Sequence, residues 1–149
     1  MNHPLIQPLI ESVCNVLSMM TQTPCSTASD GPGPQDIPRE RVVGCVSISG
    51  DVQAHVRLIF PSETGDALVR RMTGLSEVSA QGVDDALGEL CNMIVGSAKS
   101  SLSLEHTSLS CPTVLRETGV DDTPADAQTT TTRFKSEAGP FTMVLLQAA

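Results

Sequence analysis

The chain has 149 residues, a length typical of one domain, and 40% of them are hydrophobic, which is enough for one core. Its net charge of −8 and its lack of Trp and Tyr argue against nucleic-acid binding, which needs clustered Lys and Arg and aromatic side chains for base stacking. The five cysteines form no C-x-x-C pair and the three histidines are scattered, so neither a disulfide framework nor a metal site is expected. The N-terminus lacks a signal-peptide pattern and an apolar stretch of membrane length, so we expect a cytoplasmic protein without membrane attachment.

The first part of the chain predicts one helix, one loop and two strands. Apolar residues recur at helical spacing from Gln7 to Thr21. The segment Thr23–Pro38 is rich in Ser, Thr, Pro and Gly and is expected to be a flexible loop. Two β-branched runs, Val42–Ile48 and Val52–Phe60, flank Ser49-Gly50-Asp51 and predict a hairpin.

The rest of the chain predicts two helices and three strands. Pro61 opens a helix that ends at Gly74, with Ser62 or Thr64 as its cap, and a longer helix follows. Strands are predicted at Leu109–Leu115, Thr129–Phe134 and Phe141–Leu146, with an acidic loop at Glu117–Gln128. The last two strands form a closing hairpin. The predicted fold class is α+β, an antiparallel β-sheet with helices packed mainly on one face, in a single domain of residues 1–149.

The longer helix, from Val83 to Leu102, carries a polar face opposite an apolar stripe. The stripe comprises Val83, Leu87, Leu90, Ile94 and Ala98 and is expected to face the core. On the other side Glu89 and Asn92 lie roughly 60° apart, with Asp85 and Gly96 one turn before and after them. A glycine inside a helix costs about 0.5–1 kcal/mol relative to alanine. Gly96 therefore indicates either a partner that approaches the backbone or relief of crowding between helices.

Glu89 and Asn92 include no strong nucleophile, and the sequence offers no Ser-His-Asp or Cys-His pairing beside them. Cys91 flanks the core stripe and is expected to be a packed thiol. The Asn amide can donate to and accept from one water molecule, and the carboxylate can pair with a cation on a partner. The pattern suits hydrolysis in which a partner supplies the electrophile and the metal. An ordinary solvated helix face is the alternative interpretation.

The run Asp84–Lys99, DDALGELCNMIVGSAK, resembles the signature helix of the CheX branch of the CheC/CheX/FliY phosphatases of bacterial chemotaxis. The resemblance extends to the first helix, the hairpin, the next strand and the final turn, at Ile10–Leu17, Ile48–Asp51, Pro112–Val114 and Glu137–Phe141. CheC-type relatives resemble a duplicated unit with a second E-x-x-N on the first helix. Here Glu11 is followed by Cys14 and then by Asn15, so the resemblance implies one site per chain.

The resemblance implies a phosphatase, a hydrolase of the phosphoaspartate on a CheY-type response regulator of two-component signalling. By that likeness Asn92 would orient the attacking water and Glu89 would pair with the receiver's lysine, while Asp85 and Gly96 would belong to the partner-binding face. The receiver would supply Mg²⁺, and this chain would bind no cofactor itself. The resemblance also implies a homodimer formed through edge strands, with the closing hairpin as a candidate. A non-catalytic receiver-binding or scaffold module and a small acidic dimerisation domain are the alternatives.

Overall fold

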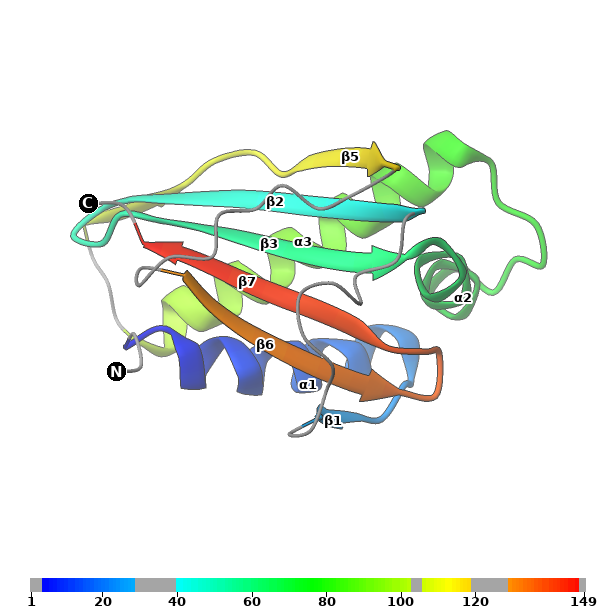
Figure 1. Cartoon of the computed structure of the whole chain (residues 1–149), viewed down its shortest axis with the longest axis horizontal. Helices are drawn as coiled ribbons and strands as arrows, with labels where there is room; N and C mark the ends of the chain where they lie inside the picture. The colour runs from blue at the N-terminus through cyan, green and yellow to red at the C-terminus, as the bar shows by residue number, and fades with distance from the viewer. Residues whose placement is uncertain (1–3, 29–39, 103–105, 119–128, 148–149) are drawn as a thin grey trace.

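The computed structural model describes residues 4–28, 40–102, 106–118 and 129–147. Within these ranges seven strands form one antiparallel sheet, accompanied by three helices (Figure 1). The helices are α1 (Ile6–Thr21), α2 (Ser62–Thr73) and α3 (Ala80–Ser101). The strands are β1 (Cys25–Thr27), β2 (Arg41–Gly50), β3 (Ala54–Pro61), β4 (Thr107–Leu109), β5 (Thr113–Glu117), β6 (Thr129–Ser136) and β7 (Phe141–Gln147). The predicted α+β fold class is confirmed.

The sheet has the strand order β1-β6-β7-β3-β2-β4, and β5 also pairs with β2. The helices α1 and α3 lie behind the sheet in Figure 1, and α2 lies at the end of β3. The apolar stripe predicted for the long helix is buried in the core between α3 and the sheet. On the opposite face of the sheet Val43, Ile59 and Val144 form a second small buried cluster. The helices therefore cover mainly one face, as predicted.

The sequence predicts one strand where the structure has two, β4 and β5. Both pair with β2, but the register shifts by one residue between Ile48↔Leu109 and Cys45↔Thr113. Three residues, 110–112, therefore face two residues of β2, and the backbone N–H of Ser110 donates to the Ser47 carbonyl. Pro112 has no N–H to give to a ladder, so the strand is interrupted by a β-bulge at this point.

Two other local predictions are wrong. The segment Cys25–Thr27, expected to be loop, forms β1 because it pairs with the end of β6. Neither Ser62 nor Thr64 caps α2: the N-cap is Pro61, and the Thr64 hydroxyl donates to the Pro140 carbonyl instead. The predicted closing hairpin is confirmed as β6 and β7, with β7 between β6 and β3. The segments 29–38 and 119–128 of the two expected loops lie outside the described residues.

Candidate functional site

The helix α3 begins three residues earlier than the apolar pattern predicts. Ser79 is its N-cap, and the Ser79 Oγ accepts a hydrogen bond from the Gly82 backbone N–H at 3.0 Å. The Arg116 guanidinium of β5 pairs with the Asp84 carboxylate at 3.0 Å and donates to the Ala80 carbonyl. The first turns of α3 are thus held by a cap and by an ion pair to the neighbouring strand.

Contacts on three sides fix the rotation of α3 about its axis. Beneath it, the Cys91 side chain packs directly against Gly44 of β2. On one side, the Ser12 hydroxyl of α1 donates to the Ile94 carbonyl. On the other side, Gly88 packs against Val114 and Pro112, at the end of the β-bulge. The remaining side of α3 faces outward, and its orientation is set by these buried contacts.

The outward side carries the residues that the helical pattern selected. The side chains of Asp85, Glu89 and Asn92 are exposed, and Gly96 is partly buried. The Asp85 carboxylate accepts a hydrogen bond from the Gln81 amide at 2.8 Å. Within the described residues, the Glu89 and Asn92 side chains form no hydrogen bond or ion pair, so both groups are available to a partner. The four residues on one exposed side of α3 are called the α3 face below.

The β-bulge at residues 110–112 forms one border of the α3 face, and sequence reasoning missed it. A Cβ atom placed on Gly88 would lie 3.8 Å from Pro112, and one on Gly96 would lie 3.9 Å from Leu109. Asn92 lies midway between these glycines along the helix, so residues 110–112 run beside it. Pro112 inside a predicted strand was the available signal, because proline in a strand indicates an edge or a bulge.

Cys91 is not a nucleophile at this site. Its side chain is fully buried, and burial raises the pKa of the Cys91 thiol to about 12. The thiol therefore stays protonated at neutral pH, whereas the thiolate is the reactive form. The prediction of a packed thiol is confirmed. Among the residues that the structure describes, no three His, Cys, Asp or Glu side chains gather closely enough to hold a metal ion.

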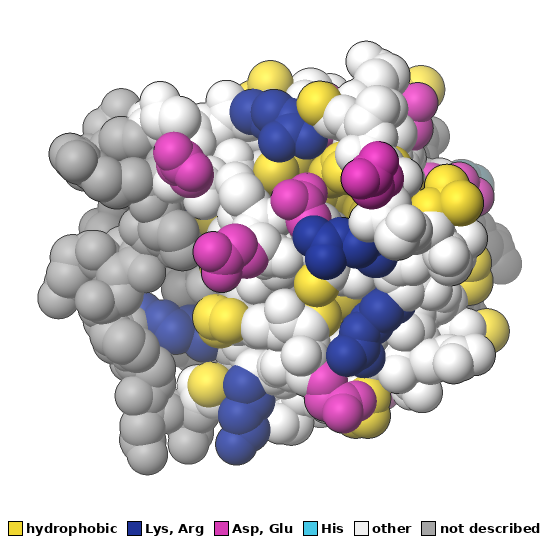
Figure 2. Space-filling view, turned by 90° about the vertical axis from the view of Figure 1, so that its right-hand side faces the viewer, with side chains coloured by type: hydrophobic (Ala, Val, Ile, Leu, Met, Phe, Trp, Pro, Cys, Tyr) yellow, Lys and Arg dark blue, Asp and Glu magenta, His cyan; other side chains and the backbone are white. Residues whose placement is uncertain are grey.

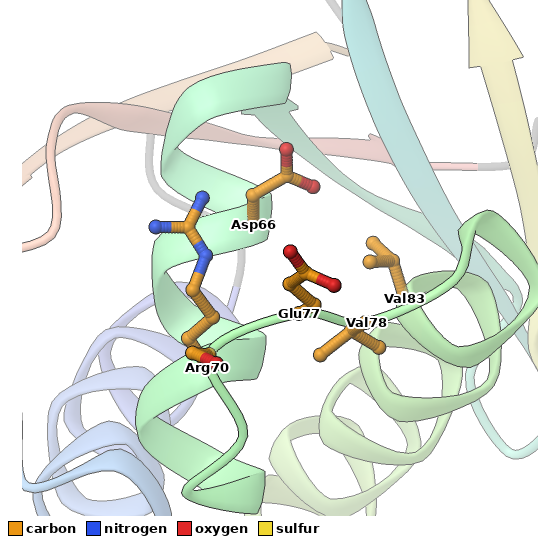
Figure 3. A pocket seen from close by; sticks show the side chains of 6 residues that line it. Asp66, Arg70, Glu77, Val78 and Val83 are labelled. Carbon is orange, nitrogen blue, oxygen red and sulfur yellow. The ribbon is translucent and has the colours of Figure 1, made fainter.

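A separate hollow of about 350 Å³ lies between α2 and the start of α3 (Figure 3). It is lined by Asp66, Arg70, Ser76, Glu77, Val78 and Val83. Val83 is buried and lies about 160° around the helix from Asp85, so this hollow is not part of the α3 face. Figure 2 shows Lys and Arg side chains interspersed with Asp and Glu on the end of the molecule that carries α2. No helix in the described ranges combines the length and apolar character that crossing a membrane needs.

The residues of the α3 face lie within the range that a family model matches. The family model described as chemotaxis phosphatase CheX matches residues 42–135, more than half of the chain, and this range includes all of α3. The chain belongs to the CheX family. No curated protein matches the chain in sequence.

Solved CheX structures share the fold over nearly the whole chain. The chemotaxis protein CheX from Desulfovibrio desulfuricans is 23% identical, with a TM-score of 0.81, over 98% of this chain and 100% of that one. The chemotaxis protein CheX from Vibrio vulnificus is 21% identical, with a TM-score of 0.80, over 97% and 96%. A CheX–CheY–BeF₃–Mg²⁺ complex from Borrelia burgdorferi contains a chain that is 12% identical, with a TM-score of 0.74, over 99% and 100%.

Proposed function

We propose that this CheX-family chain hydrolyses the phosphoaspartate of a CheY-type response regulator, with the α3 face as its docking and catalytic surface. Two findings support this proposal. The family is one of chemotaxis phosphatases, and the Borrelia burgdorferi relative was solved with CheY, Mg²⁺ and beryllofluoride, a mimic of a phosphoryl group. Such a reaction takes place in the cytoplasm, where the sequence predicts the protein to be.

Asn92 is the residue to which we assign the attacking water. Its carboxamide is exposed and forms no hydrogen bond within the described residues, so its donor and its acceptor can both be used by one water molecule. Phosphoryl transfer needs little covalent chemistry from the protein, because alignment of the water with the phosphorus and stabilisation of charge lower most of the barrier. A single positioned carboxamide is therefore a sufficient contribution from this chain.

Glu89 is assigned to the lysine of the receiver, with Asp85 beside it on the same face. An exposed carboxylate can form an ion pair with an ammonium group from a partner, and Glu89 has no cation of its own within the described residues. The Gln81 amide holds the Asp85 side chain one turn earlier. The receiver supplies Mg²⁺ and its acidic ligands, so the complete site forms only in the complex.

One observation carries this proposal: Glu89 and Asn92, two polar side chains without a partner among the described residues, lie on the same exposed side of a helix whose rotation is fixed. A surface helix held by packing on three sides keeps Glu89 and Asn92 in one direction before any partner arrives. Preorganisation of this kind reduces the entropy that docking must overcome.

The test is the decay of Mg²⁺-bound phosphorylated CheY-type receivers from the same genome, followed as phosphate release with and without this protein. Acceleration that Asn92→Ala removes supports the proposal. Binding to a receiver without acceleration favours the non-catalytic scaffold function instead. Absence of both binding and acceleration with every receiver favours a small acidic dimerisation domain.

A homodimer is a second proposal, and it is independent of the chemistry. The described strands that border the sheet are β1, β4 and β5, and Leu115 on β5 is 47% exposed. Exposed strand edges pair readily with a second chain. Sedimentation of the full chain, with Leu115→Lys as the variant that weakens this edge, distinguishes a dimer from a monomer.

A further inference from the structure

Three glycines lie in α3, and their surroundings differ. A Cβ atom on Gly82 would lie 2.7 Å from Val78 Cγ1, and one on Gly88 would lie 3.3 Å from Val114 Cγ2. Both positions are too tight for a side chain unless a neighbour moves. Among the described residues, a Cβ atom on Gly96 would meet only Leu109 Cδ1, at 3.9 Å, which is an ordinary van der Waals contact.

The backbone does not require glycine at position 96 either. The described glycines with positive φ are Gly50, Gly74 and Gly139, so Gly96 has a conformation that any residue adopts inside a helix. Alanine is more favourable than glycine at such a position. Crowding between helices, one of the two interpretations from the sequence, is therefore excluded as the reason for Gly96.

We propose that Gly96 sets how deeply Asn92 enters the partner, because the receiver's backbone comes to rest on α3 at this glycine. This inference rests on the proposed function. Gly96 lies four residues after Asn92, about 6 Å along the axis and about 40° around it. A partner surface that covers the Asn92 side chain therefore also covers Gly96. The contact fits a loop at the mouth of a phosphoaspartate pocket, with Leu109 as the apolar wall beside it.

A methyl group at position 96 would hold the receiver away from α3. The Asn92 amide would then stand back from the phosphorus and its water would leave the line of attack. A misplacement of about 1 Å can lower a rate by about 100-fold. The fold itself gains from the same substitution, because the methyl group meets only one ordinary contact within the described residues. Loss of activity together with a gain of stability is the signature of a glycine kept for a partner.

The experiment compares the wild-type chain with Gly96→Ala, Gly96→Leu and the neighbouring exposed control Ser97→Ala. Each is measured by thermal unfolding, by affinity for beryllofluoride-Mg²⁺-loaded CheY-type receivers, and by the saturating rate of phosphate release from phosphorylated receivers. We expect Gly96→Ala to melt at the wild-type temperature or above it and to lower the saturating rate at least tenfold. Gly96→Leu is expected to lower receiver affinity further, and Ser97→Ala is expected to match the wild type.

Two results overturn the inference while leaving the proposed function intact. One is a wild-type chain that accelerates hydrolysis and a Gly96→Ala chain that does so equally well. The other is a Gly96→Ala chain that melts at a clearly lower temperature, because the glycine would then be structural. If the wild-type chain fails to accelerate hydrolysis of every phosphorylated receiver tested, the proposed function itself is overturned, and this inference with it.

Discussion

The Sγ atom of Cys91 in α3 occupies the space that a side chain on Gly44 of β2 would need. The helix and the sheet therefore approach each other closely at this point. A helix turns by about 100° per residue, so when the Cys91 side chain points into the sheet, the Asn92 side chain points about 100° away from it, on the exposed side of α3. The buried contact and the exposed carboxamide are two consequences of one helix rotation.

Gly44→Ala is expected to destabilise the protein by about 1–3 kcal/mol, the usual cost of overpacking a core. Urea unfolding followed by circular dichroism measures this change. Cys91→Ala in the same chain removes the sulfur atom, so the double variant is expected to recover part of the loss. Strictly additive losses in the two variants would show that the two side chains do not compete for one space.

The buried Cys91 thiol predicts a loss of stability in alkali. Burial raises its pKa to about 12 in the folded state, whereas a thiol in the unfolded chain ionises near about 8.5. The folded state therefore holds the proton more tightly. The contribution of Cys91 to stability is fully present below about pH 8.5 and is lost as the pH rises toward 12. Unfolding free energies from pH 7 to 11 are expected to fall less steeply in Cys91→Ala than in the wild type.

Alkylation gives a second measure of the same burial. Cys111 is exposed and Cys91 is buried, so iodoacetamide at pH 8.5 is expected to modify Cys111 in the folded protein and Cys91 only after unfolding. Peptide mass spectrometry over a time course reports both sites. Equal rates at the two cysteines would contradict the close packing of α3 on the sheet.

Glu89→Gln keeps the size of the side chain and removes its charge. If the carboxylate pairs with a lysine of the receiver, the substitution is expected to weaken the complex by about 0.5–2 kcal/mol, with a smaller difference from the wild type at high salt. Titrating a beryllofluoride-Mg²⁺-loaded receiver at low and high ionic strength measures this. Glu11→Gln, an exposed glutamate on α1, is the matched control. Equal affinities for the wild type and Glu89→Gln at both salt concentrations would remove Glu89 from the interface.

The spacing of apolar and polar residues along the chain predicted those parts of the fold that depend on residues close together in sequence. The apolar spacing of α3 identified its buried stripe, and the same spacing placed Asp85, Glu89 and Asn92 outside, where the structure has them. The ends of the three helices were predicted to within three residues, because apolar spacing marks α1 and α3 and because Pro61 and Gly74 border α2.

The features that sequence reasoning missed depend on neighbours that are distant along the chain. Cys25–Thr27 has no strand pattern of its own and becomes β1 because the end of β6 offers it a ladder. The break between β4 and β5 follows from a register shift against β2. The two interpretations of Gly96 were equal in sequence, and crowding was excluded only by the space in the structure, where a Cβ atom on Gly96 would lie 3.9 Å from Leu109 Cδ1.

Asn92 is the residue assigned to position the water that hydrolyses the phosphoaspartate. The most direct measurement is the single-turnover decay of a phosphorylated CheY-type receiver at saturating protein, for the wild type, Asn92→Ala and Asn15→Ala. Asn15 is an exposed asparagine on α1 and serves as the matched control. We predict that Asn92→Ala folds with wild-type stability and loses most of the acceleration, while Asn15→Ala retains it. An Asn92→Ala chain that is fully folded and still accelerates decay at the wild-type rate would contradict this role of Asn92.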